Sequence, residues 1–172
     1  MVIWIIGMSG SGKTTIGGRL AARLKKTHPN LVFLDGDILR DVWGDWLGHD
    51  IAGRRVNAHR ISHLCRVLDL QKIHIVAAVL SIFPEWQRWN RENFSRYFEV
   101  FLDVPMQVLQ ARDPKALYRR AFAGEIQNVV GVDIPFPRVE HPDLVLDNAT
   151  DLTDVEPLVE RVLTVLPPLE VE

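Results

Sequence analysis

The chain contains a single cysteine, Cys65, among its 172 residues. An internal disulfide is therefore excluded, and one cysteine cannot by itself build a zinc site. Long apolar runs are also lacking, since none approaches the ~18 residues of a transmembrane helix. The first apolar run, Val2 to Ile6, follows no basic segment, is too short to span a bilayer and runs directly into a glycine loop. These features predict a cytoplasmic protein with reduced thiols and no membrane partner.

An excess of charge of either sign is missing as well. Lys and Arg number 20 against 22 Asp and Glu, for a net charge of -2. The chain as a whole therefore has no field that would attract nucleic acid or an anionic membrane, and any anion must be bound locally. At about 150 residues per domain, the length predicts one domain over residues 1–172.

Short apolar runs alternate with helical patterns along the chain. This alternation predicts an α/β fold with a doubly wound, parallel, five-stranded sheet and helices on both faces. The predicted strands are Val2 to Ile6, Leu31 to Leu34, His74 to Leu80, Phe98 to Val104 and Leu144 to Leu146. Helices are predicted over Lys13 to Lys26, over Arg54 to Gln71 and from about Thr153.

One long segment, 112–137, has a different composition. It mixes Arg, Lys and Tyr with glycines and prolines and shows little strand character. Ligands of doubly wound folds bind at the carboxyl ends of the strands and in the loops that follow them. We therefore expect this segment to be a mobile lid over a site at that edge of the sheet.

The strongest motif is Gly7-Met8-Ser9-Gly10-Ser11-Gly12-Lys13-Thr14, a full match to G-x-x-x-x-G-K-[ST] between a predicted strand and a predicted helix. Glycines let backbone N–H groups surround an anion, and the helix N-terminus adds positive potential. Lys13 reaches the outer phosphates and the Thr14 hydroxyl ligates Mg²⁺. The motif predicts ATP and Mg²⁺ as cofactors, bound by Gly7, Ser9, Gly10, Ser11, Gly12, Lys13, Thr14 and Thr15.

A second motif, Asp35-Gly36-Asp37 with Arg40, ends the second predicted strand. Phosphoryl transfer needs a group that positions and deprotonates the attacking hydroxyl and a group that holds the metal. We assign both roles to Asp37, with Thr14 as its partner at the metal and Lys13 as the other catalytic residue. Arg40 can neutralise an acceptor anion. The blander interpretation is a strand-ending turn with an Asx cap.

A polar helix face carries Arg54, Asn57 and Arg60. Residues three apart on a helix are neighbours, so this face can grip a second anion. On its own the pattern is more typical of a solvated helix surface.

Together these motifs resemble the adenylylsulfate kinase family, whose members phosphorylate the 3'-hydroxyl of adenylyl sulfate with ATP. The resemblance also covers Ser81, the run Glu99 to Asp103, Arg112-Asp113-Pro114-Lys115 and Gly131-Val132-Asp133. It implies a homodimer, and a lid around Lys115 to Gly131. The acceptor-binding positions that it implies are Asp35, Arg40, His49, Arg54, Asn57, Ser81, Lys115 and Val129.

The sequence departs from the family at the acceptor base. Where the family has two phenylalanines that sandwich adenine, this chain has His49 and Val129. Aromatic stacking contributes on the order of 1 to 3 kcal/mol per base, so adenine affinity would fall about ten- to a hundredfold without compensation. Relatives of the family act on cytidine diphosphoramidate, so a cytidine nucleotide is an alternative acceptor. A sensor that binds ATP without transferring phosphate is an alternative of another class.

Three weaker patterns favour structural roles. The pairs Trp43 with Trp46 and Trp86 with Trp89 have helical spacing that is typical of core packing, although one pair could replace the missing base platform. His59 and His63 have the spacing of metal ligands, but no nearby Glu or Cys completes a set.

Overall fold

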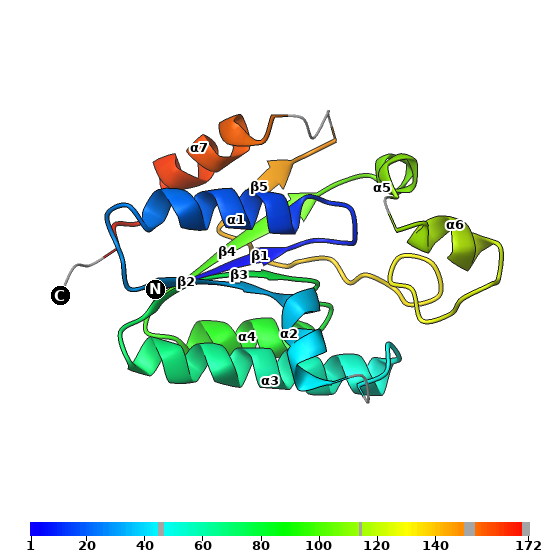
Figure 1. The fold of residues 1–172 in the computed structure, drawn as a ribbon, viewed down its shortest axis with the longest axis horizontal. Coiled ribbons are helices and arrows are strands. Elements are labelled where there is room, and N and C mark those ends of the chain that lie inside the picture. The colour runs from blue at the N-terminus through cyan, green and yellow to red at the C-terminus, as the bar shows by residue number, and fades with distance from the viewer. Residues whose placement is uncertain (45–46, 114, 150–153, 170–172) are drawn as a thin grey trace.

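The computed structural model of the chain describes residues 1–44, 47–113, 115–149 and 154–169. Its centre is a parallel sheet of five strands in the order β2-β3-β1-β4-β5 (Figure 1). The strands are β1 (Val2–Ile6), β2 (Leu31–Asp35), β3 (His74–Val79), β4 (Tyr97–Asp103) and β5 (Leu144–Asp147). The predicted doubly wound fold and the positions of its strands are confirmed.

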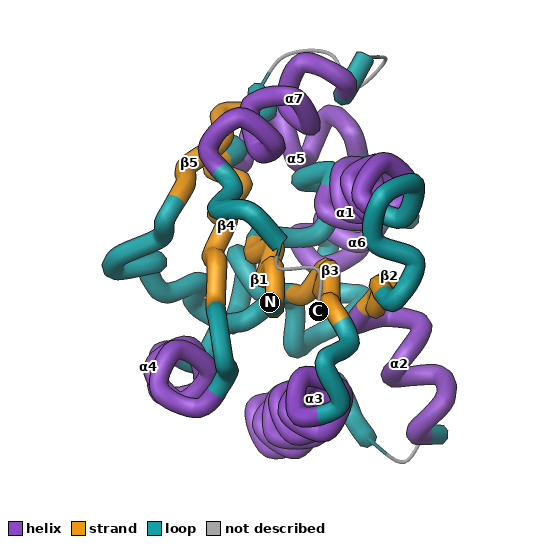
Figure 2. The backbone as a smooth tube through the Cα atoms, turned by 90° about the vertical axis from the view of Figure 1, so that its left-hand side faces the viewer, coloured by secondary structure: helices purple, strands orange, loops and turns teal. Residues whose placement is uncertain are grey.

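Helices cover both faces of the sheet, as the view of Figure 2 shows. One face carries α1 (Lys13–Leu24) and α7 (Glu156–Val165), and the other carries α2 (Gly36–Trp43), α3 (Ile51–Leu70) and α4 (Pro84–Asn93). In β1, Ile3 and Ile5 pack toward the first layer, whereas Val2, Trp4 and Ile6 pack toward the second. Because both faces are covered, the central strand is apolar throughout.

The observed helices correct the predicted boundaries. The first predicted helix ends at Leu24 instead of Lys26, and the second begins at Ile51, three residues before Arg54. Asp50 sets this earlier start, because its Oδ1 accepts a hydrogen bond from the Gly53 amide at 2.7 Å and caps the helix. The last helix begins at Glu156. Thr153 and Trp46 lie outside the described residues.

The predicted lid has more structure than its composition indicates. It follows α5 (Met106–Arg112) and contains α6 (Leu117–Phe122), which lie beside the carboxyl ends of the strands (Figure 1). Tyr118 and Val129 are buried against Val104 and Leu109 in a small apolar cluster, which we call the lid cluster. The lid therefore has a core of its own, while its only described β pairing is an isolated bridge between Val130 and Ile134.

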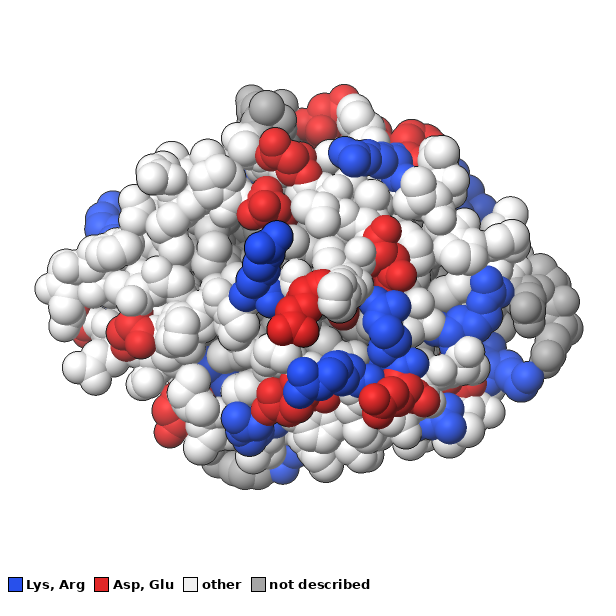
Figure 3. Space-filling model, turned by 180° about the vertical axis from the view of Figure 1, so that it is seen from behind, with Lys and Arg blue, Asp and Glu red and all other residues white. Residues whose placement is uncertain are grey.

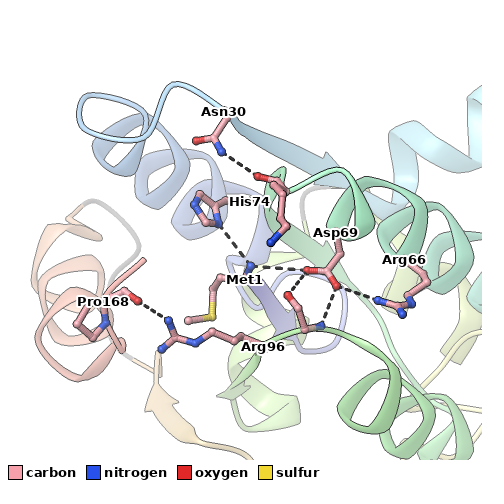
Figure 4. Close-up of polar contacts among 9 residues, drawn as sticks. Met1, Asn30, Arg66, Asp69, His74, Arg96 and Pro168 are labelled. Carbon is pink, nitrogen blue, oxygen red and sulfur yellow. Dashed lines mark hydrogen bonds and ion pairs between the residues drawn. The ribbon is translucent and has the colours of Figure 1, made fainter. Parts of the chain in front are cut away.

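The opposite end of the sheet is held by a buried carboxylate (Figure 4). Asp69 accepts hydrogen bonds from the Ser95 hydroxyl at 2.6 Å and the Ser95 amide at 2.8 Å. It also pairs with Arg66 and with the amino group of Met1. These contacts join α3 to the start of β1 and to the segment before β4, at the end of the sheet remote from the lid.

Cys65 is fully buried on α3, and burial raises the pKa of its thiol well above the ordinary value. A buried thiol with a raised pKa forms little thiolate, so Cys65 is unreactive. Among the described residues, no cluster of three or more histidine, cysteine or acidic side chains is placed to hold a metal ion, and His59 stacks on His63.

Charged side chains of both signs are interspersed on the face that Figure 3 shows. Arg91 and Asp143, for example, pair at 3.0 Å at the surface. Within the described parts of the chain, no helix has the length and apolar character to cross a membrane. Because ligands of doubly wound folds bind at the carboxyl ends of the strands, we expect a local anion site in the loops there.

Candidate active site

The glycine-rich loop joins β1 directly to α1. Gly10 and Gly12 have φ values of 77° and 97°, in the left-handed region that side chains with a Cβ rarely adopt. The loop is closed by a hydrogen bond from the Ser11 amide to the Met8 carbonyl oxygen at 3.2 Å. Outside the loop, buried Asn148 donates from Nδ2 to the Ser11 carbonyl oxygen at 2.8 Å. The backbone is therefore fixed in the shape that the motif predicts.

Lys13 begins α1 and folds back over the loop, where its Nζ donates to the Met8 carbonyl oxygen at 2.8 Å. Burial lowers the pKa of Lys13 from 10.5 to about 8, although the nearby charges of Asp37 and Asp35 oppose this change. A phosphate bound in the loop would add a further negative charge beside the ammonium group of Lys13.

Asp35, at the end of β2, performs two tasks. Its Oδ1 accepts from the amides of Asp37 and Ile38 and caps α2, as the blander interpretation of this motif predicted. Its Oδ2 accepts from the Thr14 hydroxyl at 2.6 Å. A hydroxyl and a carboxylate beside a phosphate loop fit the oxygen ligands that Mg²⁺ prefers. The sequence grouped Thr14 with Asp37 at the metal, whereas the contact in the structure is between Thr14 and Asp35.

Asp37 stands on the first turn of α2 with its side chain exposed. Lys115 of the lid pairs with its Oδ2 at 3.1 Å. The contact bridges 78 residues of sequence and joins the lid to the first turn of α2. Asp37, Asp35 and Lys115 are all near enough to Lys13 to affect its pKa. Four of the residues that the sequence singled out are thus one electrostatic group.

Arg40 supports the segment that carries His49. Its guanidinium donates to the carbonyl oxygens of Leu47 at 2.7 Å and Gly48 at 3.0 Å. Burial lowers the pKa of His49, and the positive charges of Arg40 and Arg54 lower it further. Both effects favour the neutral imidazole of His49, which stands at the position that the resemblance gives to the acceptor base.

The face of α3 that carries Arg54 and Asn57 contains polar atoms without partners. Arg54 donates through NH2 to the Asn128 carbonyl oxygen at 2.7 Å, but its Nε is buried and makes no hydrogen bond among the described residues. One turn later, Asn57 is 9% exposed, and its Oδ1 accepts no hydrogen bond from any described residue. Such groups are costly unless something binds them, so they indicate a ligand at this face.

Ser81 and Val129 have other surroundings. Ser81 adopts a φ of 51°, and its hydroxyl accepts from the indole nitrogen of Trp4 at 3.2 Å and from Gln87 at 3.4 Å. Val129 is 3% exposed within the lid cluster, so it offers almost no side-chain surface to a base.

Sequence reasoning missed two contacts that fix the lid. The Tyr118 hydroxyl donates to the Ser9 carbonyl oxygen at 2.9 Å, which joins the lid cluster to the glycine-rich loop. The Asn128 carbonyl oxygen accepts a hydrogen bond from Arg54, which joins the lid to α3. Tyr118 lies three residues after Lys115, but no local sequence pattern predicts a contact across 109 residues.

The parallel sheet, the glycine-rich loop with Lys13 and Thr14, and the acidic residues after β2 define the class of P-loop kinases. Comparison with known proteins narrows this class. The profile of the adenylylsulphate kinase family matches residues 1–147, and the chain belongs to that family.

Individual relatives cover most of the chain. A cytidine diphosphoramidate kinase of Campylobacter jejuni is 40% identical over 148 residues, which are 86% of each chain. An adenylyl-sulfate kinase of Paraburkholderia xenovorans is 39% identical over 163 residues, 94% of this chain and 90% of that one. The structure of the APS kinase CysC of Mycobacterium tuberculosis with AMPPNP and APS superposes with a TM-score of 0.84 at 33% identity, over 96% of both chains.

Proposed function

We propose that the protein transfers the γ-phosphoryl group of ATP to the 3'-hydroxyl of an acceptor nucleotide, with adenylyl sulfate as the first candidate. The observation that carries the proposal is the juxtaposition of two anion sites around one exposed carboxylate. Asp37 lies close enough to Lys13 of the glycine-rich loop, to Arg40 of α2 and to Arg54 of α3 to affect the pKa of each of them.

In this proposal the reaction depends on positioning and charge neutralisation. Loop amides and Lys13 bind the phosphates of ATP, while Asp37 orients the acceptor hydroxyl and accepts its proton. Arg40, Arg54 and Asn57 bind the acceptor, and Ser81 lines its pocket. Lys115 would exchange its ion pair with Asp37 for the substrate's negative charge.

Mg²⁺ would be held by the Thr14 hydroxyl, and the carboxylates of Asp35 and Asp37 would lie near the ion. When bound, the ion would neutralise the negative charge that develops on the phosphate oxygens. The hydrogen bond between Thr14 and Asp35 supports this assignment, because it keeps the hydroxyl oriented beside the loop.

A cytidine nucleotide is the second candidate acceptor. The position of Val129 favours it, because a residue buried in the lid cluster cannot stack on a purine. The single imidazole of His49 is a smaller platform than two phenyl rings. The 40% identity to the cytidine diphosphoramidate kinase supports the same alternative.

The test is ADP formation from MgATP with adenylyl sulfate or cytidine diphosphoramidate as acceptor. Stimulation by adenylyl sulfate supports the first candidate, and stimulation by the cytidine nucleotide alone supports the second. ATP binding without stimulation by either compound would reject the kinase function and favour a sensor. We also propose a homodimer in the cytoplasm, for which light scattering after size-exclusion chromatography tests the oligomeric state.

His49 offers a variant that separates the two acceptors. His49→Phe should restore part of an aromatic platform and raise the affinity for adenine by up to about tenfold. The ratio of kcat/KM for adenylyl sulfate to that for the cytidine nucleotide measures the change. An unchanged ratio would remove His49 from the base-binding surface.

A further inference from the structure

The lid segment 128–134 is shaped by one carboxylate. Asp133 accepts from the amides of Asn128 and Val129, each at 2.5 Å. The Val129 carbonyl oxygen in turn accepts from the amides of residues 132, 133 and 134. The loop is thus closed around Val129, and Asn128 is left with a φ of 65°, a conformation that non-glycine residues seldom adopt.

This loop presents a carbonyl group to the face of α3 that carries Arg54 and Asn57. The NH2 group of Arg54 donates a hydrogen bond to the Asn128 carbonyl oxygen at 2.7 Å. The guanidinium group is planar and rigid, so a bond at one end fixes the direction of its remaining donors. The buried Nε, which has no hydrogen-bond partner among the described residues, is one of these donors.

Asp133 has no evident role in the apolar core. Its side chain is exposed, whereas the neighbouring Val129 supplies the buried contacts to the lid cluster. Its hydrogen bonds instead determine where the Asn128 carbonyl points. The amides that it accepts from hold the pKa of its carboxyl below the ordinary value, and the charge of Arg54 acts in the same direction.

We propose that Asp133 is a positioning residue for the acceptor: by its hydrogen bonds to residues 128 and 129 it aims the Asn128 carbonyl at Arg54, which orients the guanidinium group and its unpaired Nε toward the acceptor's anionic group. The inference rests on the proposed function through the acceptor-binding role of Arg54. It adds that the lid controls acceptor affinity through this carbonyl and not only by covering the site.

A purely structural role for Asp133 predicts a different result. Val129 shares the lid cluster with Tyr118, whose hydroxyl holds the glycine-rich loop. General loosening of the lid would therefore weaken binding of ATP and of the acceptor together. Positioning through Arg54 instead predicts a selective loss of acceptor affinity.

The experiment compares Asp133→Asn with wild type by steady-state kinetics and by calorimetric binding of the acceptor, which needs no turnover. The substitution removes a hydrogen bond from a backbone amide to a charged oxygen. It should raise the acceptor KM and Kd about tenfold, while the KM for ATP changes little. Asp133→Glu should also raise the acceptor KM, because it keeps the charge but displaces the oxygens. The matched control is Glu125→Gln, which removes an exposed carboxylate of the lid that pairs with Arg120.

A double variant tests the route through Arg54. If Asp133 acts through it, Asp133→Asn should add little to the effect of Arg54→Lys on acceptor Kd. Additive effects, an equal rise in the KM for ATP, or unchanged acceptor Kd in both Asp133 variants would overturn the proposal. If wild type binds and phosphorylates the acceptor and the Asp133 variants behave like wild type, only the positioning role is refuted. Wild type that transfers phosphate to neither acceptor refutes the proposed function instead.

Discussion

Removal of the loop lysine should stabilise the ligand-free protein while it abolishes turnover. Burial lowers the pKa of Lys13 to about 8 from its ordinary 10.5. At pH 7 the native state therefore holds a proton that it binds less tightly than the unfolded chain does. This difference corresponds to about 3 kcal/mol at 1.36 kcal/mol per pH unit. Lys13 is partly exposed, and screening by water reduces the penalty to about 2 kcal/mol.

Lys13→Met removes this penalty but also the hydrogen bond to the Met8 carbonyl, which contributes about 1 kcal/mol. We therefore expect the variant to be about 1 kcal/mol more stable than wild type near pH 7. As pH rises from about 8 toward 10.5, native Lys13 loses its proton before the unfolded chain does, so wild type gains stability. The advantage of the variant should disappear in this window.

Urea unfolding near pH 7 and near pH 9.5 measures both values. Lys25→Met, which removes an exposed lysine, is the control and should show no comparable dependence on pH. A Lys13→Met variant that is less stable than wild type at pH 7, or a difference in stability that is the same at both pH values, would refute the reasoning.

Three further substitutions test separate parts of the site. Asp37→Asn should lower kcat by several orders of magnitude and leave the melting temperature unchanged, because the side chain is exposed; retained activity would exclude it as the base. Asp35→Asn should raise the Mg²⁺ concentration needed for half-maximal rate about ten- to a hundredfold, through the lost partner of Thr14; a normal Mg²⁺ dependence would place the metal elsewhere. Ala116→Gly should raise the unfolding free energy by about 0.5 to 1 kcal/mol in denaturant unfolding, because Ala116 has a φ of 50°, and a loss of stability would contradict this account.

The sheet and the glycine-rich loop could be predicted because their signals are local. In β1 and β3 every residue is buried, so an unbroken apolar run marks each strand. The loop motif is similarly contiguous in sequence. Helices α2 and α4 lack such a signal: α2 has eight residues with one buried, and α4 is mostly polar and buries only Asn90. Their positions depend on what packs against them.

The assignment of roles within the site was harder to predict. Asp35 and Asp37 are two residues apart and chemically identical, yet the first contacts Thr14 and caps α2 while the second faces Lys115. Sequence spacing does not show which carboxylate turns toward the loop. The contact of Arg54 with Asn128 spans 74 residues and uses a backbone carbonyl, so no side-chain pattern encodes it.

The most direct test of the central claim follows the phosphate itself. MgATP labelled at the γ-phosphate is incubated with the enzyme and adenylyl sulfate or the cytidine nucleotide, each beside a counterpart that lacks the 3'-hydroxyl. We predict that label appears on an acceptor that has this hydroxyl and that none appears on its 3'-deoxy counterpart. Equal labelling of both, or ADP formation that is independent of any acceptor, would contradict the account.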